Sequence, residues 1–333
     1  MVVVVDAFGG DNAPLEIIKG AALAQKEYGV KIILTGDKGV IENCIKENNI
    51  SFNELQIEHA EDVISMHDEP TSLLKAHKNS SMAVAFNLLA EDKADAFVSA
   101  GSTGAIVVGG TLIIKRIKGV KRPALASMIP SPDSSYMLMD MGANAECRPE
   151  MLCQFGILSS LYLSYVEGRK NPKIGLLNIG TEDTKGTELQ KEAHKLLSES
   201  GINFVGNVES REMPKGVCDA VVTDGFTGNI ALKLIEGTAT TLFKMIKGVL
   251  YKNPINVLCA AILKKDLYSL KNKMDSSSVG GALLLGVKKP VIKAHGSSNA
   301  FAIKNAIAQA IRFHESGVID TMTKAIAENI NEE

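Results

Sequence analysis

The stretch VVVVDAFGGDNAPLEIIKGAALAQKEYGVKIILTG, residues 2–36, contains one complete strand–helix–strand pattern. Four valines at 2–5 predict a buried strand, residues 14–28 have the apolar spacing of a helix, and residues 30–36 predict a second strand. A helical crossover of this kind joins strands that lie parallel. Further apolar runs, each followed by a helical pattern, occur at 55–59, 95–100, 172–180 and 218–225. We therefore expect an α/β protein with three layers (α/β/α), in which helices cover both faces of a mostly parallel sheet.

The bulk composition is that of an ordinary globular protein. The chain has 333 residues, of which 45% are apolar and 22% charged, and it shows no linker, repeat or low-complexity tract. We expect a single unit over residues 1–333, with a division into two lobes left open. The net charge of −2 provides no general attraction for nucleic acid, so we expect no nucleic-acid partner.

Cysteine usage and the N-terminal sequence indicate a cytoplasmic protein. Five scattered cysteines without a C-x-x-C pair argue against a disulfide framework and a structural zinc site. The N-terminus has no basic segment ahead of its apolar run, so it does not resemble a signal peptide. No apolar run approaches the roughly 20 residues needed to span a bilayer.

Residues 246–274 depart from the alternating pattern. Lysines flank an apolar helical face in this segment, which predicts a helical protrusion that lies on a membrane surface or packs against a second subunit. Both interpretations stay open at this point. The residues expected to make that contact are Val249, Leu250, Ile255, Val257 and Leu258.

Six predicted strand ends carry glycine together with Ser, Thr, Asn or Asp. Ligands of open parallel sheets bind at the carboxyl ends of the strands, so we expect these loops to meet at one edge and bind an anion such as phosphate through backbone N–H groups. The sequence contains neither G-x-G-x-x-G nor a P-loop. The candidate binding residues in these loops are Asp6, Gly9, Gly10, Gly101, Ser102, Thr103, Gly104, Asn144, Asp224, Ser297, Ser298 and Asn299.

Three side chains stand out as possible cationic contacts. Lys293 and His295 end a buried-looking strand beside the turn Gly296–Asn299, and Lys185 lies in a glycine-bounded loop before a helix. The alternatives are plain helix capping for the turn and a solvated loop lysine for Lys185.

These loops resemble those of the bacterial phosphate acyltransferases, the acyl-ACP:phosphate transacylases of phospholipid synthesis. The matching stretches are DAFGGD, SAGSTGA, DMGANAECRP, NIGTEDTKG, VTDGFTGN and LLGVKKPVIKAHGSSNA, which run in family order from residue 6 to residue 300. The resemblance implies reversible transfer of a fatty acyl group from acyl carrier protein to inorganic phosphate. It also implies a homodimer with an isocitrate/isopropylmalate-dehydrogenase-like fold, no metal or nucleotide cofactor, and a product that passes to a membrane glycerol-3-phosphate acyltransferase.

This reaction needs positioning of phosphate and stabilisation of the charge that grows on the thioester carbonyl. We expect Lys185 and Asn229 to contact the phosphate or the carbonyl oxyanion, with Lys293 or His295 near the anion. Acyl carrier protein is acidic, so its docking surface should be basic. The segment IIKRIKGVKRP supplies such a surface through Lys115, Arg116, Lys118, Lys121 and Arg122.

Three other functions fit parts of the pattern. A short-chain phosphotransacylase that uses acyl-CoA shares the phosphate chemistry but needs no basic patch or apolar protrusion. A decarboxylating dehydrogenase needs a dinucleotide and usually a metal held by clustered acids, which the sequence does not show. A non-catalytic membrane scaffold would not need six intact glycine and hydroxyl loops.

Overall fold

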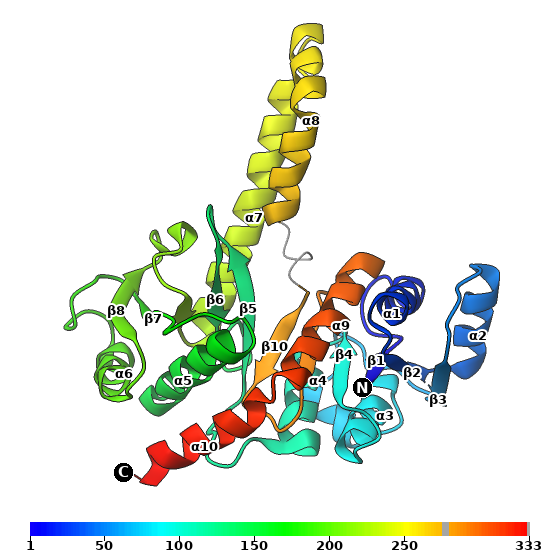
Figure 1. Ribbon diagram of the computed structural model, residues 1–333, viewed down its shortest axis with the longest axis horizontal. Coiled ribbons are helices and arrows are strands. Elements are labelled where there is room, and N and C mark those ends of the chain that lie inside the picture. Colours follow the sequence, from blue (N-terminus) through cyan, green and yellow to red (C-terminus); the bar gives the residue numbers. More distant parts are fainter. Residues whose placement is uncertain (275–279, 332–333) are drawn as a thin grey trace.

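The computed structural model describes residues 1–274 and 280–331. A single central sheet has helices packed on both faces, and a long helical hairpin rises from the body (Figure 1). The expected three-layer α/β/α architecture is therefore confirmed.

The sheet contains eleven strands among the described residues. In spatial order they are β3 (Leu55–His59), β2 (Lys31–Gly36), β1 (Val2–Asp6), β4 (Ala96–Ser99), β11 (Val291–Lys293), β10 (Ala282–Leu285), β5 (Ala124–Pro130), β6 (Ser135–Met139), β9 (Ala220–Val222), β7 (Ile174–Asn178) and β8 (Phe204–Glu209).

The helices alternate with these strands along most of the chain. They are α1 (Leu15–Tyr28), α2 (Lys38–Glu47), α3 (Ser81–Ala90), α4 (Thr103–Gly109), α5 (Pro149–Tyr165), α6 (Glu188–Glu199), α7 (Gly225–Leu250), α8 (Pro254–Met274), α9 (Ala300–Glu315) and α10 (Val318–Asn331). Three shorter helical segments are η1 (Pro70–Leu74), η2 (Gly110–Lys115) and η3 (Met213–Lys215).

Strand direction reverses near the centre of the sheet. Strands β3, β2, β1, β4 and β11 are mutually parallel, and β10 is antiparallel to both β11 and β5. The β5–β6 hairpin then turns the chain round, and β9, β7 and β8 follow the direction of β6. The two halves of the sheet therefore run in opposite directions.

Each face of the sheet has its own apolar core. Helices α1, α5, α9 and α10 bury residues such as Ile18, Phe155 and Ile307 on one face. On the other face α3 and α4 bury Phe86 and Ile106, and the beginning of α7 packs through Leu232 and Ile235. This second face carries the cavity described below.

Helix α7 starts at the end of β9 and continues far beyond the body, where α8 returns beside it (Figure 1). The predicted protrusion at 246–274 is thus the outer part of a longer hairpin that turns at Tyr251–Asn253. Within the described residues, no helix is both long enough and apolar enough to cross a membrane.

A close contact fixes the base of α7 against the sheet. A Cβ atom at Gly228 would lie 1.8 Å from the carbonyl oxygen of Asp140, a separation that no side chain tolerates. Glycine at this position lets the helix backbone approach the loop that follows β6. The direction in which the hairpin leaves the body therefore depends on this contact.

Gly228→Ala should destabilise the fold by about 1–3 kcal/mol or more, because the added methyl group forces α7 away from Asp140. Chemical denaturation monitored by circular dichroism measures this change. Gly248→Ala is the matched control on the same helix, since a Cβ atom at that position would have no atom of another residue within 4 Å. It should leave stability unchanged or raise it by up to about 1 kcal/mol. Equal stability of the two variants would show that the Gly228 contact does not hold the helix.

Candidate active site

A large cavity of about 1360 Å³ lies between the α7–α8 hairpin and the second face of the sheet. Alternate residues Leu125, Ser127 and Ile129 of β5 form part of its floor, since alternate residues of a strand point to the same face. The loops after β1, β4 and β11 contribute Asp11, Thr103 and residues 295–299.

The loops after β1, β4 and β11 are in direct contact, as expected from the sequence. The buried carboxylate of Asp6 accepts a hydrogen bond of 2.7 Å from Ser99 Oγ, which accepts one of 2.9 Å from the amide of Gly101. Burial raises the pKa of Asp6, and its hydrogen bonds act in the opposite direction. A Cβ atom at Gly9 would lie 2.7 Å from Asp6 Oδ2, Gly101 N and Ser99 Oγ, so this packing requires glycine.

The third loop of this group joins the first through the backbone. The amide of Asp11 donates to the carbonyl of Gly296 at 2.8 Å, and Asn12 Nδ2 donates to the carbonyl of Ser297 at 3.0 Å. Gly10 adopts a φ of +96°, and its Cβ would lie 2.8 Å from the carbonyl oxygen of Gly296. Three of the six predicted loops therefore meet at one edge of the sheet.

The other three loops lie at the opposite edge, which corrects the expectation that all six converge. They follow β6, β7 and β9, and these strands run against β1, β4 and β11 because of the β5–β6 hairpin. The turn sequence PSPDSS (130–135) between two apolar runs is typical of such a hairpin and would have predicted the reversal.

At this second edge two loops are joined around a buried carboxylate. Asp140 accepts hydrogen bonds from the amides of Gly142, Ala143 and Asn144 and from Asn144 Nδ2, at 2.7–3.1 Å. The Asn144 side chain also donates to the carbonyl of Pro123 at 2.8 Å. Burial raises the pKa of Asp140, against the effect of these donors. Asn144 is thus held by structural contacts.

Asp224 has a capping role in the same region. Its Oδ1 accepts from the amide of Thr227 at 2.8 Å, and Thr227 Oγ1 donates to Oδ2 at the same distance. This is the ordinary N-cap geometry of a long helix, and it fixes the start of α7.

Helix α7 connects the two edges along the cavity. Asn229 in its first turn lies beside Gly142, where an added Cβ atom would be 3.5 Å from Asn229 Cβ. One turn further on, Lys233 and Glu236 form an ion pair of 2.8 Å and line the same cavity as Lys293 and His295. The cavity therefore contains groups from both edges.

Lys293 lies half-buried near a second lysine, Lys233, and the carboxylates of Glu236 and Asp11. Burial lowers the pKa of Lys293 first, and Lys233 lowers it further, whereas Glu236 and Asp11 act in the opposite direction. Among the described residues its ammonium group has neither a hydrogen bond nor an ion pair. Burial and the neighbouring Lys293 also lower the pKa of His295, so its imidazole is neutral at pH 7. Such a site favours an added anion.

The turn before α9 is a cap, and four of the amides at this turn already have acceptors within the chain. Asn299 Oδ1 accepts from the amide of Ala302, and Glu16 Oε2 accepts from the amide of Ala300 at 2.8 Å. The amides of Ser297 and Ser298 donate to Nδ1 and the carbonyl oxygen of His295, respectively. Acceptors within the chain occupy these four donors, so these amides are not free to form the expected nest.

One hydroxyl group in this turn has no partner. Ser298 is 5% exposed, and its Oγ makes no hydrogen bond in the described structure. Ser297 differs, since its Oγ lies 2.9 Å from His295 Nδ1. Buried hydroxyl groups are normally hydrogen-bonded, so Ser298 Oγ is available to a ligand in the cavity.

The remaining candidates lie at the following places. Thr103 lines the cavity, Ser102 is buried at the start of α4, and a Cβ at Gly104 would contact Pro70. Lys185 is exposed in the loop after β7, and it does not line the cavity of this chain.

The residues expected on the docking surface and on the protrusion are mostly exposed. On the surface, from the last residue of η2 to the segment before β5, lie Lys115, Arg116, Lys118, Lys121 and Arg122. Arg116 also donates from Nη1 to the carbonyls of Val120, at 3.1 Å, and Lys121. Of the five protrusion residues, Val249, Ile255, Val257 and Leu258 are exposed, whereas Leu250 is half-buried and lines the cavity.

Asp11, Lys233 and Glu236 are among the cavity residues that were not identified from the sequence. Lys233 and Glu236 interrupt an otherwise apolar helical run with two charges at i and i+3. That spacing is also typical of a solvated ion pair, so the pattern offered no reason to assign them to a site.

Comparison with known proteins identifies the family. A family model described as "Fatty acid synthesis protein" matches residues 1–321. A phosphate acyltransferase from Alkaliphilus oremlandii is 46% identical over 98% of both chains. Another from Oceanobacillus iheyensis is 47% identical over 97% of this chain and 96% of its own.

Solved structures share the fold at low sequence identity. A phosphotransacetylase from Streptococcus pyogenes aligns over 98% of this chain and 94% of its own, with a TM-score of 0.63 and 17% identity. A 4-hydroxythreonine-4-phosphate dehydrogenase from Klebsiella pneumoniae aligns over 94% of this chain and 99% of its own, with a TM-score of 0.52 and 13% identity. With relatives above 45% identity along nearly its whole length, this chain belongs to the phosphate acyltransferase family of fatty acid synthesis proteins.

Proposed function

We propose that this chain transfers a fatty acyl group from the thioester of an acyl carrier protein to inorganic phosphate, in a reversible reaction that yields an acyl phosphate. A phosphate oxygen forms a bond to the thioester carbonyl carbon, the C–S bond breaks, and the carrier thiol leaves. The product would serve a membrane glycerol-3-phosphate acyltransferase in phospholipid synthesis. Relatives named phosphate acyltransferase support this assignment.

The single observation that carries the proposal is a cationic, unsatisfied site inside a large cavity. Lys293 is half-buried without a partner among the described residues, Ser298 Oγ is buried without one, and Lys233 lies close enough to lower the pKa of Lys293. A phosphate ion satisfies Lys293 and Ser298, while Lys233, already paired with Glu236, adds positive charge nearby. The amides of residues 297, 298, 300 and 302 are already bound, so in this proposal side chains rather than these amides hold the anion.

Phosphate needs no protein nucleophile, so the protein acts by positioning and by stabilising the developing oxyanion. Asn229 lines the same cavity as Lys293 and is our candidate donor to the carbonyl oxygen. His295, neutral at pH 7, is a candidate for proton transfer. We retain Lys185 as a candidate contact to the substrate, although it would have to reach the reacting groups from outside this cavity.

The carrier protein docks, we propose, on the exposed basic loop formed by Lys115, Arg116, Lys118, Lys121 and Arg122. This loop leads directly to Pro123, whose carbonyl accepts the hydrogen bond from Asn144. It therefore adjoins the end of the cavity at which Gly142 and Asn229 lie. A thioester presented from this side would enter between the two edges of the sheet.

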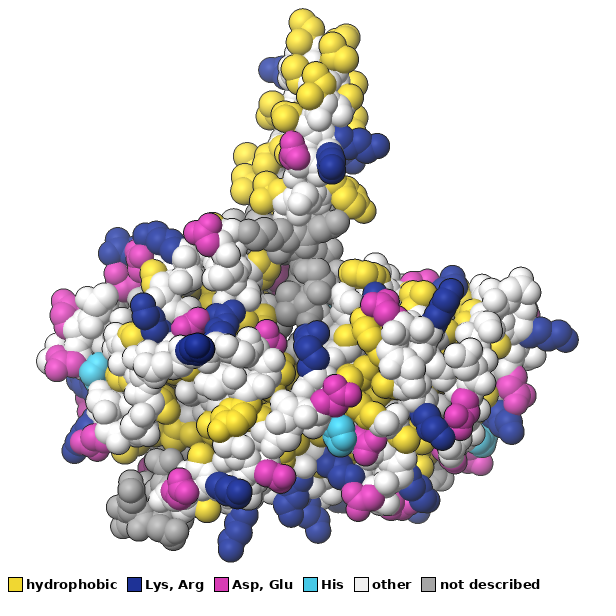
Figure 2. All heavy atoms as spheres, in the orientation of Figure 1, with side chains coloured by type: hydrophobic (Ala, Val, Ile, Leu, Met, Phe, Trp, Pro, Cys, Tyr) yellow, Lys and Arg dark blue, Asp and Glu magenta, His cyan; other side chains and the backbone are white. Residues whose placement is uncertain are grey.

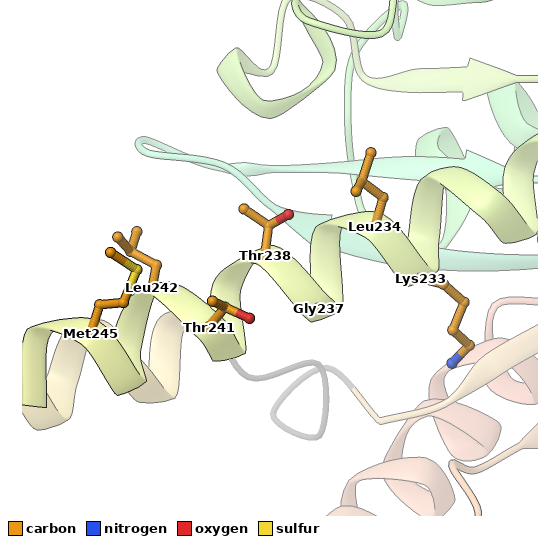
Figure 3. Close-up of a pocket in the computed structure, with 7 residues that line it drawn as sticks. All are labelled: Lys233, Leu234, Gly237, Thr238, Thr241, Leu242 and Met245. Carbon is orange, nitrogen blue, oxygen red and sulfur yellow. The ribbon is translucent and has the colours of Figure 1, made fainter. Parts of the chain in front are cut away.

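The outer surface of the hairpin suits two further contacts. A shallow groove of about 430 Å³ runs along α7 and is lined by Leu234, Thr238, Leu242 and Met245 together with Lys233, Gly237 and Thr241 (Figure 3). We assign this groove to a second copy of the chain in a homodimer.

Towards the tip, apolar side chains gather with lysines among them (Figure 2). Val249, Ile255, Leu258 and Ile262 are each 63–74% exposed. We assign this end to peripheral contact with the membrane surface, where apolar side chains insert and lysines meet anionic headgroups.

Lys293→Met should raise the KM for phosphate about 10- to 100-fold, the usual effect of losing a charge-assisted hydrogen bond. The ammonium form binds the anion, and its pKa is lowered in the folded enzyme. Phosphate affinity is therefore present at neutral pH. It should be lost when the pH is raised, and this loss should occur at a pH lower than 10.5, the ordinary pKa of lysine. The pH profile of kcat/KM for phosphate measures this limb.

Lys293→Arg is the control, because arginine stays protonated and should move that limb to higher pH.

In the same assay, Asn229→Ala should lower kcat about 10²–10³-fold if the amide stabilises the oxyanion. An equal loss in Lys185→Ala would mean that the loop after β7 also reaches the substrate. Normal phosphate kinetics in Lys293→Met would refute the phosphate site, and acyl-CoA used as well as acyl carrier protein would favour the short-chain alternative.

Charge reversal by Lys118→Glu with Arg122→Glu should raise the KM for acyl carrier protein and weaken its dependence on salt. Arg116 is less suitable, because its guanidinium group holds the carbonyls of residues 120 and 121. Lys26→Glu, an exposed charge on α1, is the matched control. Kinetics at low salt that do not differ between the two variants would exclude this docking surface.

Val249→Asp with Leu258→Asp should remove most of the protein from vesicles of anionic lipid in a flotation assay, without changing its sedimentation coefficient.

Leu234→Glu with Met245→Glu should give a monomer in sedimentation velocity. This variant retains the apolar tip, so it should still float with the vesicles. If the first variant still floats with the vesicles, the membrane contact lies elsewhere. If the second variant has an unchanged sedimentation coefficient, the subunit interface lies elsewhere.

A further inference from the structure

The cavity continues well beyond the proposed phosphate site, along the inner side of the α7–α8 hairpin. We propose that this part of the cavity binds the fatty acyl chain and sets its length, with Ala239 as the position that keeps it open. This inference rests on the proposed acyl transfer. It assigns a substrate subsite and a residue that determines specificity.

One side of α7 forms the first wall. Leu232, Ala239, Phe243 and Ile246 all line the cavity and are half-buried. Their spacing of seven, four and three residues places them on one face of the helix. From Leu232 to Ile246 this face extends roughly 21 Å, at 1.5 Å per residue. An extended fatty acyl chain is of comparable length.

Helix α8 and strand β5 complete the enclosure. Ala260 and Leu267 of α8 line the cavity and are half-buried, and Leu125 and Ile129 of β5 lie on its floor. Lys244, Lys247 and Lys264 also line it, but all three are exposed, so their ammonium groups remain in water while their stems add apolar surface. The enclosed walls are therefore mainly apolar.

The order of groups along α7 gives the direction of the chain. Asn229 and Lys233, at the base, lie with the proposed phosphate site, and the apolar wall follows towards the tip. A thioester carbonyl placed between Asn229 and Lys293 therefore directs its hydrocarbon tail outward along the hairpin. A short acyl group would leave most of this wall in contact with water.

Burial of each methylene in such a groove is worth about a fourfold gain in affinity. The wall thus favours long over short acyl donors without any polar contact. Ala239 lies about halfway along it, and its small side chain leaves space that a larger residue would fill. Ala239 therefore lies between the part of the cavity next to the phosphate site and the outer part, which only a long acyl chain would reach.

The test measures kcat/KM for octanoyl, lauroyl, palmitoyl and stearoyl carrier proteins in Ala239→Trp and in the wild type. The indole group should block the outer part, so the preference for palmitoyl over octanoyl donors should fall roughly 10- to 200-fold. Phe243→Ala widens the same wall and should improve use of the stearoyl donor relative to the palmitoyl one.

Ser269→Trp is the matched control, since Ser269 is exposed on α8 and does not line the cavity. It should keep the wild-type profile. An unchanged profile in Ala239→Trp, or an equal change in Ser269→Trp, would overturn the assignment. Thermal unfolding of each variant distinguishes a blocked groove from a damaged hairpin.

A binding measurement separates this inference from the proposed function. Displacement of a fluorescent long-chain fatty acid probe by palmitate reports occupancy of the groove without turnover, and Ala239→Trp should weaken probe binding at least about tenfold. If the wild type forms no acyl phosphate with any donor, the proposed reaction is refuted. The probe measurement then tests by itself whether the groove binds a fatty acyl chain. Equal probe binding in the wild type and Ala239→Trp would overturn it.

Discussion

The reversal of strand direction at the β5–β6 hairpin governs where every loop of the candidate site lies. It sends the loops after β1, β4 and β11 to one edge of the sheet and those after β6, β7 and β9 to the other. Only an element that passes between the edges can bring both sets to one cavity. Helix α7 does this, and it can start close to Asp140 because residue 228 has no side chain.

Charge in this molecule separates into groups that build the loops and groups that remain for a ligand. The buried carboxylates of Asp6 and Asp140 are surrounded by donors from their own loops, so they hold backbone in place. Lys293 and the Ser298 hydroxyl group lack partners in the described structure although they are partly or fully buried. Unsatisfied buried groups are costly to folding, and a bound anion offsets that cost.

The α7–α8 hairpin has three surfaces with different chemistry. Its inner side encloses the apolar part of the cavity, the outer side of α7 carries a shallow apolar groove, and the tip exposes apolar residues among lysines. A long helix presents such separate faces because its side chains repeat every 3.6 residues. In our proposals these faces bind the acyl chain, a second subunit and a membrane surface.

Local patterns were enough to predict the layers, the parallel half of the sheet and the meeting of the loops at Asp6–Asp11, Ser99–Gly104 and Gly296–Asn299. These features follow from hydrophobic period and turn chemistry, which depend on near neighbours in the chain. Packing settled three other matters: which edge each loop occupies, which amides are already bound, and that Lys233 and Glu236 lie beside Lys293. Hydrophobic periodicity predicts that a strand exists but does not give its direction in the sheet. The residues that surround a charged side chain on a helix are set by tertiary packing, which the local sequence does not contain. Lys185 and Lys293 both looked like anion ligands in the sequence, and the fold placed only Lys293 in the cavity, because β6 and β9 separate β7 from the β5 floor of the cavity.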